Sequence, residues 1–418
     1  MPCPASFRNQ HRKATLVYGN KWGDYTPGGA APVNNSPYAL VHTGALRYAY
    51  GIREVEKTVM DKRYIGILVN DSWYRRIPSG RTYHESLPCY EKAGKLHGVT
   101  PCFFRLKDIK PGQPFVHAYV KSEIGYKRCL IPVPSVIHNR TLYTNKQPKA
   151  AIRRLAEDGK RIFNEWNRYG KGYIHERLME EPSLRPHLPV TRPATPAAIR
   201  DMMGDYSKLI LKPNSSSIGL GIMKLEEAAN GVWLLHGAAK NGRKIAFRPP
   251  DIPAIVRRKL RSRPYLVQQL LPLATYCGRP FDLRVSVQRN ETGDWQVTGI
   301  AAKVAKPGAF RTNVAQGGVV YSLDKVLGPY PELNPEQVRA AIGDFSLRVA
   351  CQLSRHLPRL ADIGLDVGLT EHGFPMFIEC NGRDLRYSFQ QGNMLDAFQQ
   401  IYSNPVGFAK YLLESGDR

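Results

Sequence analysis

Three oxygen-bearing side chains near the C-terminal end of the sequence, those of Asp366, Glu379 and Asn381, could together hold a divalent cation. Carboxylate and carbonyl oxygens are the ligands that Mg²⁺ prefers, and Mg²⁺ commonly shares its shell with substrate phosphates. Two carboxylates facing each other on apolar strands would destabilise the pair unless something positive lay between them. We therefore predict a magnesium site. The alternative is a surface hairpin on which Asp366 and Glu379 are solvated.

Two strands in the segment 363–383 (IGLDVGLTEHGFPMFIECNGR) would have to bring these side chains together. They flank His372-Gly373, a dipeptide suited to a two-residue hairpin turn that a Glu371–Phe374 pair would close. The following apolar residues predict that both strands are buried: Ile363, Leu365, Val367, Phe377 and Ile378.

The register follows by counting outward from this turn. Asp366 should lie directly opposite Glu379, with about 5 Å between the two Cβ atoms. Because side chains alternate along a strand, Asn381 should share the face of Glu379, whereas Cys380 should point into the other layer.

A second candidate is KLILKPNSSSIGLGIMKL at 208–225, which predicts two strands joined by a serine- and glycine-rich loop. Backbone N–H groups and serine hydroxyls of this loop could close over phosphates, with Gly219 permitting close approach and Lys212 supplying charge. A flexible hairpin tip is the alternative. Neither GxxxxGK[ST] nor GxGxxG is present here, so the loop is not a Walker A motif or a dinucleotide fingerprint.

Cations gather in a third stretch. Asp282 and Arg284 should face the same way on the strand within 264–288, and FRTNVAQGG follows shortly after Lys303. Such cations suit a transferring phosphoryl group or a substrate carboxylate. The alternative is an internal Arg284–Asp282 salt bridge beside a solvated loop. Within the same stretch, the segment 268–271 (QQLL) could present its backbone groups at a sheet edge to an adenine ring.

The net charge of +25 raises a positive potential that attracts polyanions. Zinc-finger spacing, RNP-type aromatic motifs and basic heptads are absent from the sequence, so the protein lacks a recognisable module for reading nucleic acid. Nucleotide phosphates, an acidic polymer or an acidic protein would account for the positive charge equally well. The densest basic run should lie on a helix and its exit, as a solvated face that could also dock an acidic partner; it comprises Arg257, Arg258, Lys259, Arg261 and Arg263.

Other function classes are disfavoured by what the sequence lacks. Seven cysteines without a CxxC pair indicate free thiols in a reducing compartment. The sequence contains no long apolar run and no signal-peptide pattern, which predicts a soluble protein without an ordinary secretion signal. No GxSxG motif is present, so a serine hydrolase is not expected.

The expected organisation has four parts: a partly irregular or β extension at 1–60, an α/β domain at 61–150, and two further units at 151–270 and 271–418. In the second part, strands at 64–70 and 98–105 should enclose a helix at 85–96, followed by a strand pair and a strand-to-loop element at 132–140. Further helices are expected at 149–166, 171–180 and 405–413, with a proline-rich passage after the second.

The order of these features resembles the ATP-grasp superfamily: a KP strand with its serine–glycine loop, then QQLLPL…FDLR, FRTNVAQGG and a D…ECN hairpin. More specifically, GILVNDSWYRR, VPSVIHNR, LRPHLPVTR, GRPFDLRVSVQ and FIECNGR are similar to the YheC/YheD family of endospore coat-associated proteins, over about residues 64–390. The resemblance implies an α+β ATP-grasp fold, in which two α+β subdomains clasp ATP, preceded by a small α/β N-terminal domain.

The resemblance also implies roles for individual residues. Those contacting ATP would be Lys171 and Lys212 at the phosphates, Ser215, Ser216, Ser217 and Gly219 in the covering loop, and Gln268, Gln269 and Leu271 at the adenine. Mg²⁺ would be held by Asp366, Glu379 and Asn381, and the phosphoryl group or acyl intermediate would be stabilised by Arg284, Lys303, Arg311 and Asn313. Superfamily members often carry an arginine two positions before the metal aspartate. Here that residue is Gly364, so Arg284 or Arg311 would have to supply the charge.

The implied activity is an ATP-dependent carboxylate–amine ligase that forms an amide or peptide bond through an acyl phosphate, on an acidic or spore-coat-related substrate. It would act in the mother-cell cytoplasm or the spore coat, with ATP, Mg²⁺, a carboxylate and an amine as its ligands and coat proteins as possible partners. The alternative is a catalytically silent, nucleotide-binding structural protein of the coat. A third possibility, nucleic-acid binding driven by charge, predicts steeply salt-dependent affinity without an ATP requirement.

Overall fold

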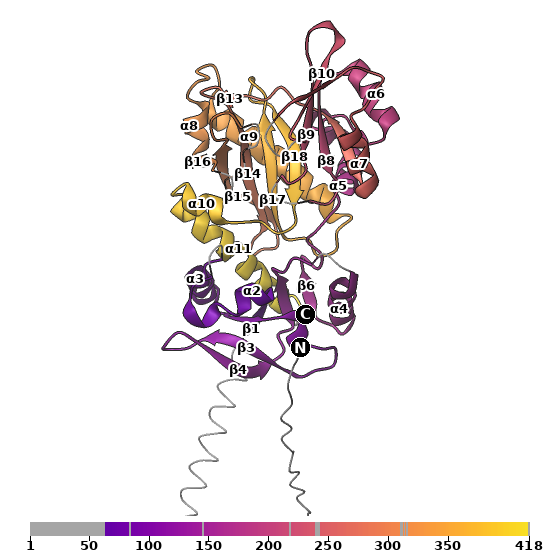
Figure 1. Ribbon diagram of the computed structural model, residues 1–418. Helices are drawn as coiled ribbons and strands as arrows, with labels where there is room; N and C mark the ends of the chain where they lie inside the picture. The colour runs from indigo at the N-terminus through magenta and orange to yellow at the C-terminus, as the bar shows by residue number, and fades with distance from the viewer. Residues whose placement is uncertain are drawn as a thin grey trace, which may run out of the picture. The chain divides into compact units, whose positions relative to one another are not determined.

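The computed structural model describes residues 63–82, 85–143, 146–216, 219–238, 243–309, 312, 314 and 317–416 (Figure 1). All the elements named below belong to one compact unit. The expected N-terminal extension at 1–60, and three predicted site residues, Ser217, Arg311 and Asn313, lie outside the described residues.

The first sheet has the strand order β4-β3-β2-β1-β5-β6. Strands β2, β1, β5 and β6 run parallel to one another, whereas β3 is antiparallel to β2 and β4 is antiparallel to β3. Every residue of β1 is buried, as expected for a central strand covered on both faces. The strand bounds are β1 Tyr64–Leu68, β2 Thr100–Phe104, β3 Phe115–Lys121, β4 Tyr126–Pro132, β5 Val136–Asn139 and β6 Arg161–Phe163. The accompanying helices are α2 Asp71–Tyr74, α3 Leu87–His97 and α4 Lys146–Glu157, with short 3₁₀ turns η1 Ile77–Ser79 and η2 Leu106–Asp108.

The predicted strand, helix and strand between residues 64 and 105 are confirmed, and so is the strand pair that follows them. The helix expected at 149–166 is wrong at its C-terminal end. Helix α4 stops at Glu157 because Gly159, with φ +82°, takes the left-handed conformation that ends helices. The chain then forms β6, so the first sheet continues to Phe163, beyond the expected boundary near residue 150.

The second sheet is antiparallel throughout, in the order β11-β10-β9-β8-β12-β7. Its strands are β7 Thr191–Pro193, β8 Lys208–Pro213, β9 Met223–Glu227, β10 Trp233–His236, β11 Ile245–Phe247 and β12 Tyr265–Gln269, with a 3₁₀ turn η4 Ala229–Gly231 between β9 and β10. Helices α6 Pro196–Asp205 and α7 Ala254–Ser262 bury Ile199, Met202 and Val256 in a core shared with β8, β9 and β12. The predicted strand pair around the serine–glycine loop is confirmed as β8 and β9.

The third sheet has the order β16-β15-β14-β17-β18, with β13 paired to β14. Its strands are β13 Thr275–Tyr276, β14 Arg279–Arg289, β15 Trp295–Val304, β16 Val319–Tyr321, β17 Asp362–Leu369 and β18 Pro375–Asn381. One face packs against α9 Pro335–Ser354 in the largest apolar core, which also takes in residues of α5 Lys171–Met179, η3 Pro182–His187 and α8 Leu323–Leu327. Thus α5, although it precedes the second sheet in the chain, is anchored in the third.

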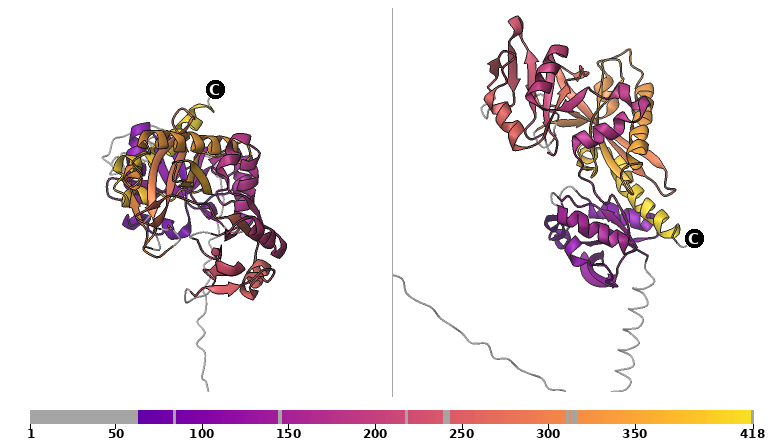
Figure 2. Two further views of the ribbon diagram at one scale, coloured as in Figure 1. Left: turned by 90° about the horizontal axis from the view of Figure 1, so that it is seen from above. Right: turned by 90° about the vertical axis from the view of Figure 1, so that its right-hand side faces the viewer.

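The C-terminal helix α11 Leu395–Glu414 connects the first and third sheets (Figures 1 and 2). It packs against α3, β1 and β5 on one side and against β14 and β15 on the other, next to α10 Tyr387–Gln391. The helix expected at 405–413 therefore begins earlier and contains Pro405. Among the residues that the structure describes, none of the helices combines the length and apolar character that a membrane span requires.

Candidate active site

The hairpin of β17 and β18 sets Asp366 directly opposite Glu379, as predicted. The prediction of a two-residue turn at His372-Gly373 is wrong. The Thr370 N–H donates to the Phe374 carbonyl at 3.0 Å, and the Phe374 N–H donates to the Thr370 hydroxyl at 3.1 Å, so three residues form the loop. The predicted Glu371–Phe374 pair is therefore absent. Between the Val367–Phe377 and Asp366–Glu379 pairs a β-bulge takes up one extra residue of β18, which restores the predicted register at the carboxylates.

The faces of the hairpin agree with the alternation argument. The Asn381 amide lies 3.3 Å from Asp366 Oδ2, so the two residues share a face. Cys380 packs against the apolar core of the third sheet. The two carboxylates and the amide therefore lie together on one face of the hairpin, which is not a fully solvated surface hairpin. Strand β17 is buried as predicted, whereas β18 is only half-buried from Ile378 to Asn381, so the predicted burial of Ile378 is wrong.

Two cations contact Asp366. Arg284, directly opposite on β14, donates from Nε to Asp366 Oδ1 at 3.0 Å, and Lys303 Nζ lies 2.8 Å from the same oxygen. The alternative of an Arg284–Asp282 salt bridge is wrong, because Arg284 pairs with Asp366 and Asp384 while Lys303 lies 2.7 Å from Asp282. Burial raises the pKa of Asp366, but Arg284 and Lys303 outweigh it and hold the pKa well below its usual range.

Gly364 has a clear structural consequence here. A Cβ at this position would lie 3.3 Å from Arg284 Cδ and only 2.5 Å from Asp384 Oδ1. The space beside Asp366 is thus filled by the Arg284 side chain from the neighbouring strand, which brings a guanidinium to a metal-ligand candidate without an arginine at position 364. Asp384 was missed in the sequence, although it directly follows the FIECNGR motif.

Lys171 joins the second and third sheets at the start of α5. Its Nζ donates to Glu379 Oε1 at 2.6 Å and to the Ser216 carbonyl at 3.1 Å. Asn214, at the start of the serine–glycine loop, fixes the helix: its carbonyl accepts from the Lys171 N–H at 3.0 Å, and its side chain accepts from the Gly172 N–H at 2.9 Å. The loop is therefore held beside the Glu379 carboxylate, with Ser215 exposed.

Lys212 is the second lysine of this region. Its ammonium makes no hydrogen bond or ion pair with any residue in the described part of the chain. Burial lowers its pKa to about 8, against the opposing attraction of Glu379. Lys212 is half-buried, so its ammonium has lost part of its hydration, and a ligand that supplied negative charge here would offset that loss.

A pocket that is open to solvent lies between the second and third sheets. Its lining combines apolar and polar side chains: Tyr169, Lys171, Ile174, His175, Thr191, Lys212, Leu266, Gln268, Phe377, Ile378, Glu379 and Cys380. Gln268 donates from Nε2 to Thr191 Oγ1 at 2.8 Å. The sequence offered a weak signal for Thr191, which lies in the quoted LRPHLPVTR segment but received no role.

The expected open sheet edge at 268–271 is wrong. Strand β12 lies between β8 and β7, and β7 pairs with it as far as Gln268. The N–H groups of Gln269 and Leu270 already donate to the carbonyls of Val190 and Lys208. Gln268 therefore reaches the pocket through its side chain, whereas Gln269 and Leu271 do not line it.

A divalent cation would fit the donor set on this face. Asp366 Oδ1 receives both cations at 3.0 Å or less, whereas the contacts of Oδ2 with described residues are the longer ones with Asn381 and Arg284, at 3.3 and 3.4 Å. In the part of the chain that the structure describes, no group of three or more His, Cys, Asp or Glu side chains forms a metal cluster. A cation here would therefore depend on two carboxylates, one amide and oxygens from a ligand.

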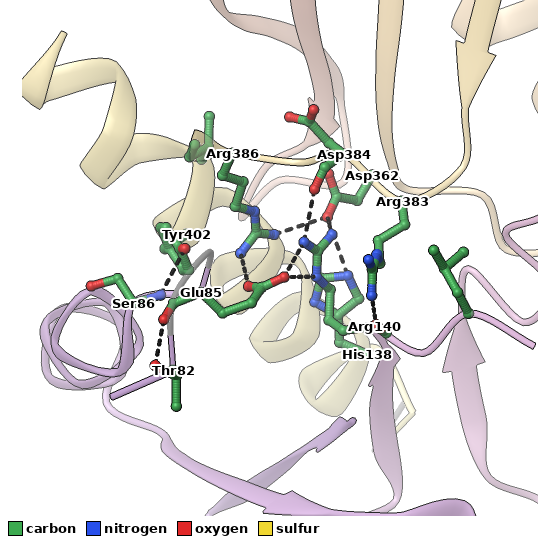
Figure 3. Close-up of polar contacts among 12 residues, drawn as sticks. Thr82, Glu85, Ser86, His138, Arg140, Asp362, Arg383, Asp384, Arg386 and Tyr402 are labelled. Atoms are coloured by element: carbon green, nitrogen blue, oxygen red, sulfur yellow. Dashed lines mark hydrogen bonds and ion pairs between the residues drawn. The ribbon is translucent and has the colours of Figure 1, made fainter. Parts of the chain in front are cut away.

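A second group of buried charges, the Arg140 cluster, lies where the first sheet meets the third (Figure 3). We define it as Glu85, His138, Arg140, Asp362 and Arg386. Arg140 Nη1 and Arg386 Nη2 lie 3.1 and 2.9 Å from Asp362 Oδ2, and both arginines also pair with Glu85. Burial lowers the pKa of His138 to about 4, so this imidazole is neutral. Sequence reasoning assigned no role to any of these side chains.

Comparison with known proteins identifies the family. Residues 159–412 match the family model "YheC/D like ATP-grasp". The chain is 26% identical over 329 residues to endospore coat-associated protein YheD of Bacillus subtilis (strain 168), which covers 75% of this chain and 71% of that protein. It is 20% identical over 312 residues to endospore coat-associated protein YheC of the same organism, which covers 73% and 86% of the two chains.

Solved structures with similar folds include a VanG D-Ala:D-Ser ligase from Enterococcus faecalis, with a TM-score of 0.49, 11% identity and coverage of 84% of this chain and 100% of that chain. D-cycloserine synthetase DcsG also has a TM-score of 0.49, with 14% identity and coverage of 82% and 99%. The family match covers more than half of the sequence and all of the site described above. The chain therefore belongs to the YheC/D-like ATP-grasp family and has an α+β ATP-grasp fold.

Proposed function

We propose that this protein is an ATP-dependent carboxylate–amine ligase. The observation that carries the proposal is the meeting of Lys171, Lys212 and Glu379 in one pocket between two sheets, with Asp366 beside Glu379. Four separate elements contribute these side chains. Two cations next to two carboxylates suit a nucleotide triphosphate bound together with a divalent cation.

ATP would bind with its base in the pocket and its phosphates at the lysines. Leu266, Ile378 and Phe377 supply apolar surface for a ring, and the Gln268 amide supplies polar groups. Lys212 supplies a half-buried ammonium that lacks an ion pair in the described residues, and Lys171 supplies a second charge. Backbone N–H groups of the adjacent loop, including Ser217, would cover the phosphates.

Magnesium would be held by Asp366, Glu379 and Asn381, whose amide would turn its oxygen toward the ion. When bound, Mg²⁺ offsets the negative charge of the phosphates. Lys171, now paired with Glu379 at 2.6 Å, would exchange that contact for phosphate oxygens. Because the Gln269 N–H already donates to the Val190 carbonyl, the remaining backbone candidates for the adenine are the Gln269 carbonyl and the N–H and carbonyl of Leu271.

The reaction would proceed in two steps. A substrate carboxylate oxygen attacks the γ-phosphorus and ADP leaves, which gives an acyl phosphate; an amine then attacks the acyl carbon, phosphate leaves, and the nitrogen loses a proton. Arg284 and Lys303 carry fixed positive charge beside Asp366 and would stabilise the phosphoryl oxygens, together with Arg311 and Asn313. Such a mechanism needs positioning and electrostatics, and no protein nucleophile.

The substrates would be acidic. The net charge of +25 favours an acidic peptide, an acidic polymer or a carboxylate-rich coat component, and the relatives named above are coat-associated proteins. The same relatives support a second candidate function, a coat protein that binds nucleotide without turnover.

The test is nucleotide binding followed by turnover, with the full chain. Calorimetric titration with ADP should show an affinity that increases with Mg²⁺, and Glu379→Gln should weaken the magnesium-dependent part by about 100-fold. Glu371→Gln, an exposed carboxylate at the tip of the same hairpin, is the matched control and should bind like the parent. ADP release should then be measured across a panel of amino acids and acidic peptides.

Release of ADP that depends on both a carboxylate and an amine, and that is lost in Glu379→Gln, would support the ligase. Magnesium-dependent ADP binding without any such release would favour the silent coat protein. If the parent chain binds no nucleotide, both candidate functions fail.

A further inference from the structure

Asp366 shares each of its two cationic partners with a second buried carboxylate. Lys303 Nζ lies 2.8 Å from Asp366 Oδ1 and 2.7 Å from Asp282 Oδ1. Arg284 donates from Nε to Asp366 at 3.0 Å and from Nη1 to Asp384 at 3.1 Å. Two cations thus lie among three carboxylates, so these five side chains, taken without Lys171, Lys212 and Glu379, carry one net negative charge when all are ionised.

Asp282 and Asp384 are held firmly in these positions. The Thr312 hydroxyl donates to Asp282 Oδ2, and the Ser286 hydroxyl donates to Asp384 Oδ2. The side chain of Asp384 has no exposed surface and that of Asp282 is 11% exposed. Neither carboxylate lines the nucleotide pocket, so neither has a direct role in the binding proposed above.

Asp384 also connects the site to the Arg140 cluster. Its backbone carbonyl accepts from Arg140 Nη2 at 2.8 Å, while its carboxylate points away from the cluster (Figure 3). Arg140 belongs to the first sheet, and Arg386, two residues after Asp384, is fixed on Asp362. The backbone is therefore anchored at the Asp384 carbonyl and again two residues later, which helps to set the direction in which the carboxylate faces Arg284.

The division of charge has a consequence for Asp366. A guanidinium held between two carboxylates neutralises neither of them fully. If one carboxylate were made neutral, the cation would move toward the other, and the net charge of the group would change from −1 to 0. In a site of low effective dielectric, this change would substantially weaken the attraction for a divalent cation.

We propose that Asp282 and Asp384 are positioning residues that draw Lys303 and Arg284 partly away from Asp366, and so leave Asp366 available to a divalent cation. This inference rests on the proposed function, because it takes Asp366 as a metal ligand. Neither residue touches the ion or the nucleotide; each acts through the cation that it shares.

The test is a titration of the full chain with Mn²⁺ at saturating ADP, in which electron paramagnetic resonance measures the bound and the free ion. Asp384→Asn and Asp282→Asn should each weaken Mn²⁺ binding by roughly tenfold or more. Both substitutions keep the side-chain volume. ADP affinity in the presence of EDTA should stay within about twofold of the parent, because the adenine and phosphate contacts are unchanged.

One control separates the local charge from a general loss of negative charge. Asp324→Asn neutralises an exposed carboxylate that pairs with Arg339, away from the site, and should bind Mn²⁺ like the parent.

The outcomes can be told apart. Parent-like Mn²⁺ binding by both Asn variants would overturn the inference while leaving the proposed function intact. An equal loss of Mn²⁺ and metal-free ADP binding would indicate a structural role only, and would also overturn it. Failure of the parent to bind Mn²⁺ with ADP would overturn the proposed metal site itself. If Asp384→Asn does not fold, the Asp282→Asn variant decides the question alone.

Discussion

The molecule contains two regions of buried charge that look alike in composition and differ in accessibility. The Arg140 cluster has two arginines and two carboxylates around a neutral histidine, with Arg386 and Asp362 fully buried. The candidate active site has four cations, Lys171, Lys212, Arg284 and Lys303, and four carboxylates, Asp282, Asp366, Glu379 and Asp384. Charge is therefore balanced in both regions, and charge balance does not distinguish the functional one.

What distinguishes them is the way in which the charges are paired. In the Arg140 cluster both arginines contact carboxylates, and Gln288 donates to the remaining oxygen of Asp362 at 2.8 Å. In the candidate site the pairs are partly open: Glu379 is 30% exposed, and Lys212 lacks an ion pair within the described residues. We call the Arg140 cluster the closed network, because each of its charged side chains has an ion-pair partner, and we call the candidate site the open network. The closed network stabilises the contact between the first and third sheets, whereas the open network can accept a ligand.

The largest effect should come from breaking the closed network. Asp362→Ala leaves Arg140 and Arg386 buried beside each other without this carboxylate, and should lower the free energy of unfolding by about 3–5 kcal/mol. Urea denaturation monitored by circular dichroism measures it. Asp324→Ala, which breaks an exposed pair, should cost about 0–1 kcal/mol. Equal losses for the two variants would show that the Arg140 cluster is no more important for stability than a surface pair.

A smaller effect should appear in the open network as pH changes. Only the protonated Lys212 attracts phosphate, and its pKa is lowered to about 8, so ADP affinity without metal should fall by roughly 25-fold as pH rises from 7.5 to 9.5. Calorimetric titration at several pH values measures this. Lys212→Met should flatten the profile, whereas Lys208→Met, at the exposed start of the same strand, should keep it. A pH-independent affinity in the parent would contradict the assignment of Lys212 to the phosphates.

The smallest effect should arise at the hairpin tip, outside both networks. Gly373 has φ +75°, and a Cβ there would lie 2.9 Å from Val338 Cγ2, so Gly373→Ala should destabilise the fold by about 1 kcal/mol. Thermal unfolding measures this loss, and His372→Ala, an exposed neighbour, should change stability by less than about 0.5 kcal/mol. Magnesium-dependent ADP binding should be unchanged in both variants. A weakened metal response in Gly373→Ala would mean that the tip controls the site.

Local features of the site could be predicted from the sequence because they depend on short-range geometry. The shared face of Glu379 and Asn381 follows from strand alternation. The Asp366–Glu379 pairing was predicted from a two-residue turn that does not form, and it is found because the bulge in β18 offsets the longer loop. The contact between Lys171 and Glu379 joins residues 208 positions apart, and the contact between Arg140 and Asp362 joins residues 222 positions apart. No periodicity in the sequence reports such contacts, and Lys171 was identified only through family resemblance.

Two errors have equally definite causes. The turn was predicted from His372-Gly373 alone, but Thr370 offers its hydroxyl and backbone to Phe374, which favours a longer loop. The sheet edge at 268–271 was inferred from a single apolar strand, because the short strand β7 that covers it gives almost no pattern of its own.

The bulge in β18 has a consequence for recognising distant relatives of this chain. The hairpin is one residue longer at its tip than a two-residue turn allows, and the bulge absorbs that residue before Glu379 is reached. Removal of one tip residue and of the bulged residue, two residues in all, would leave a two-residue turn and would keep the two carboxylates opposite each other. The number of residues between the aspartate and the glutamate is then a poor signature, and a homologue with different spacing can carry the same site.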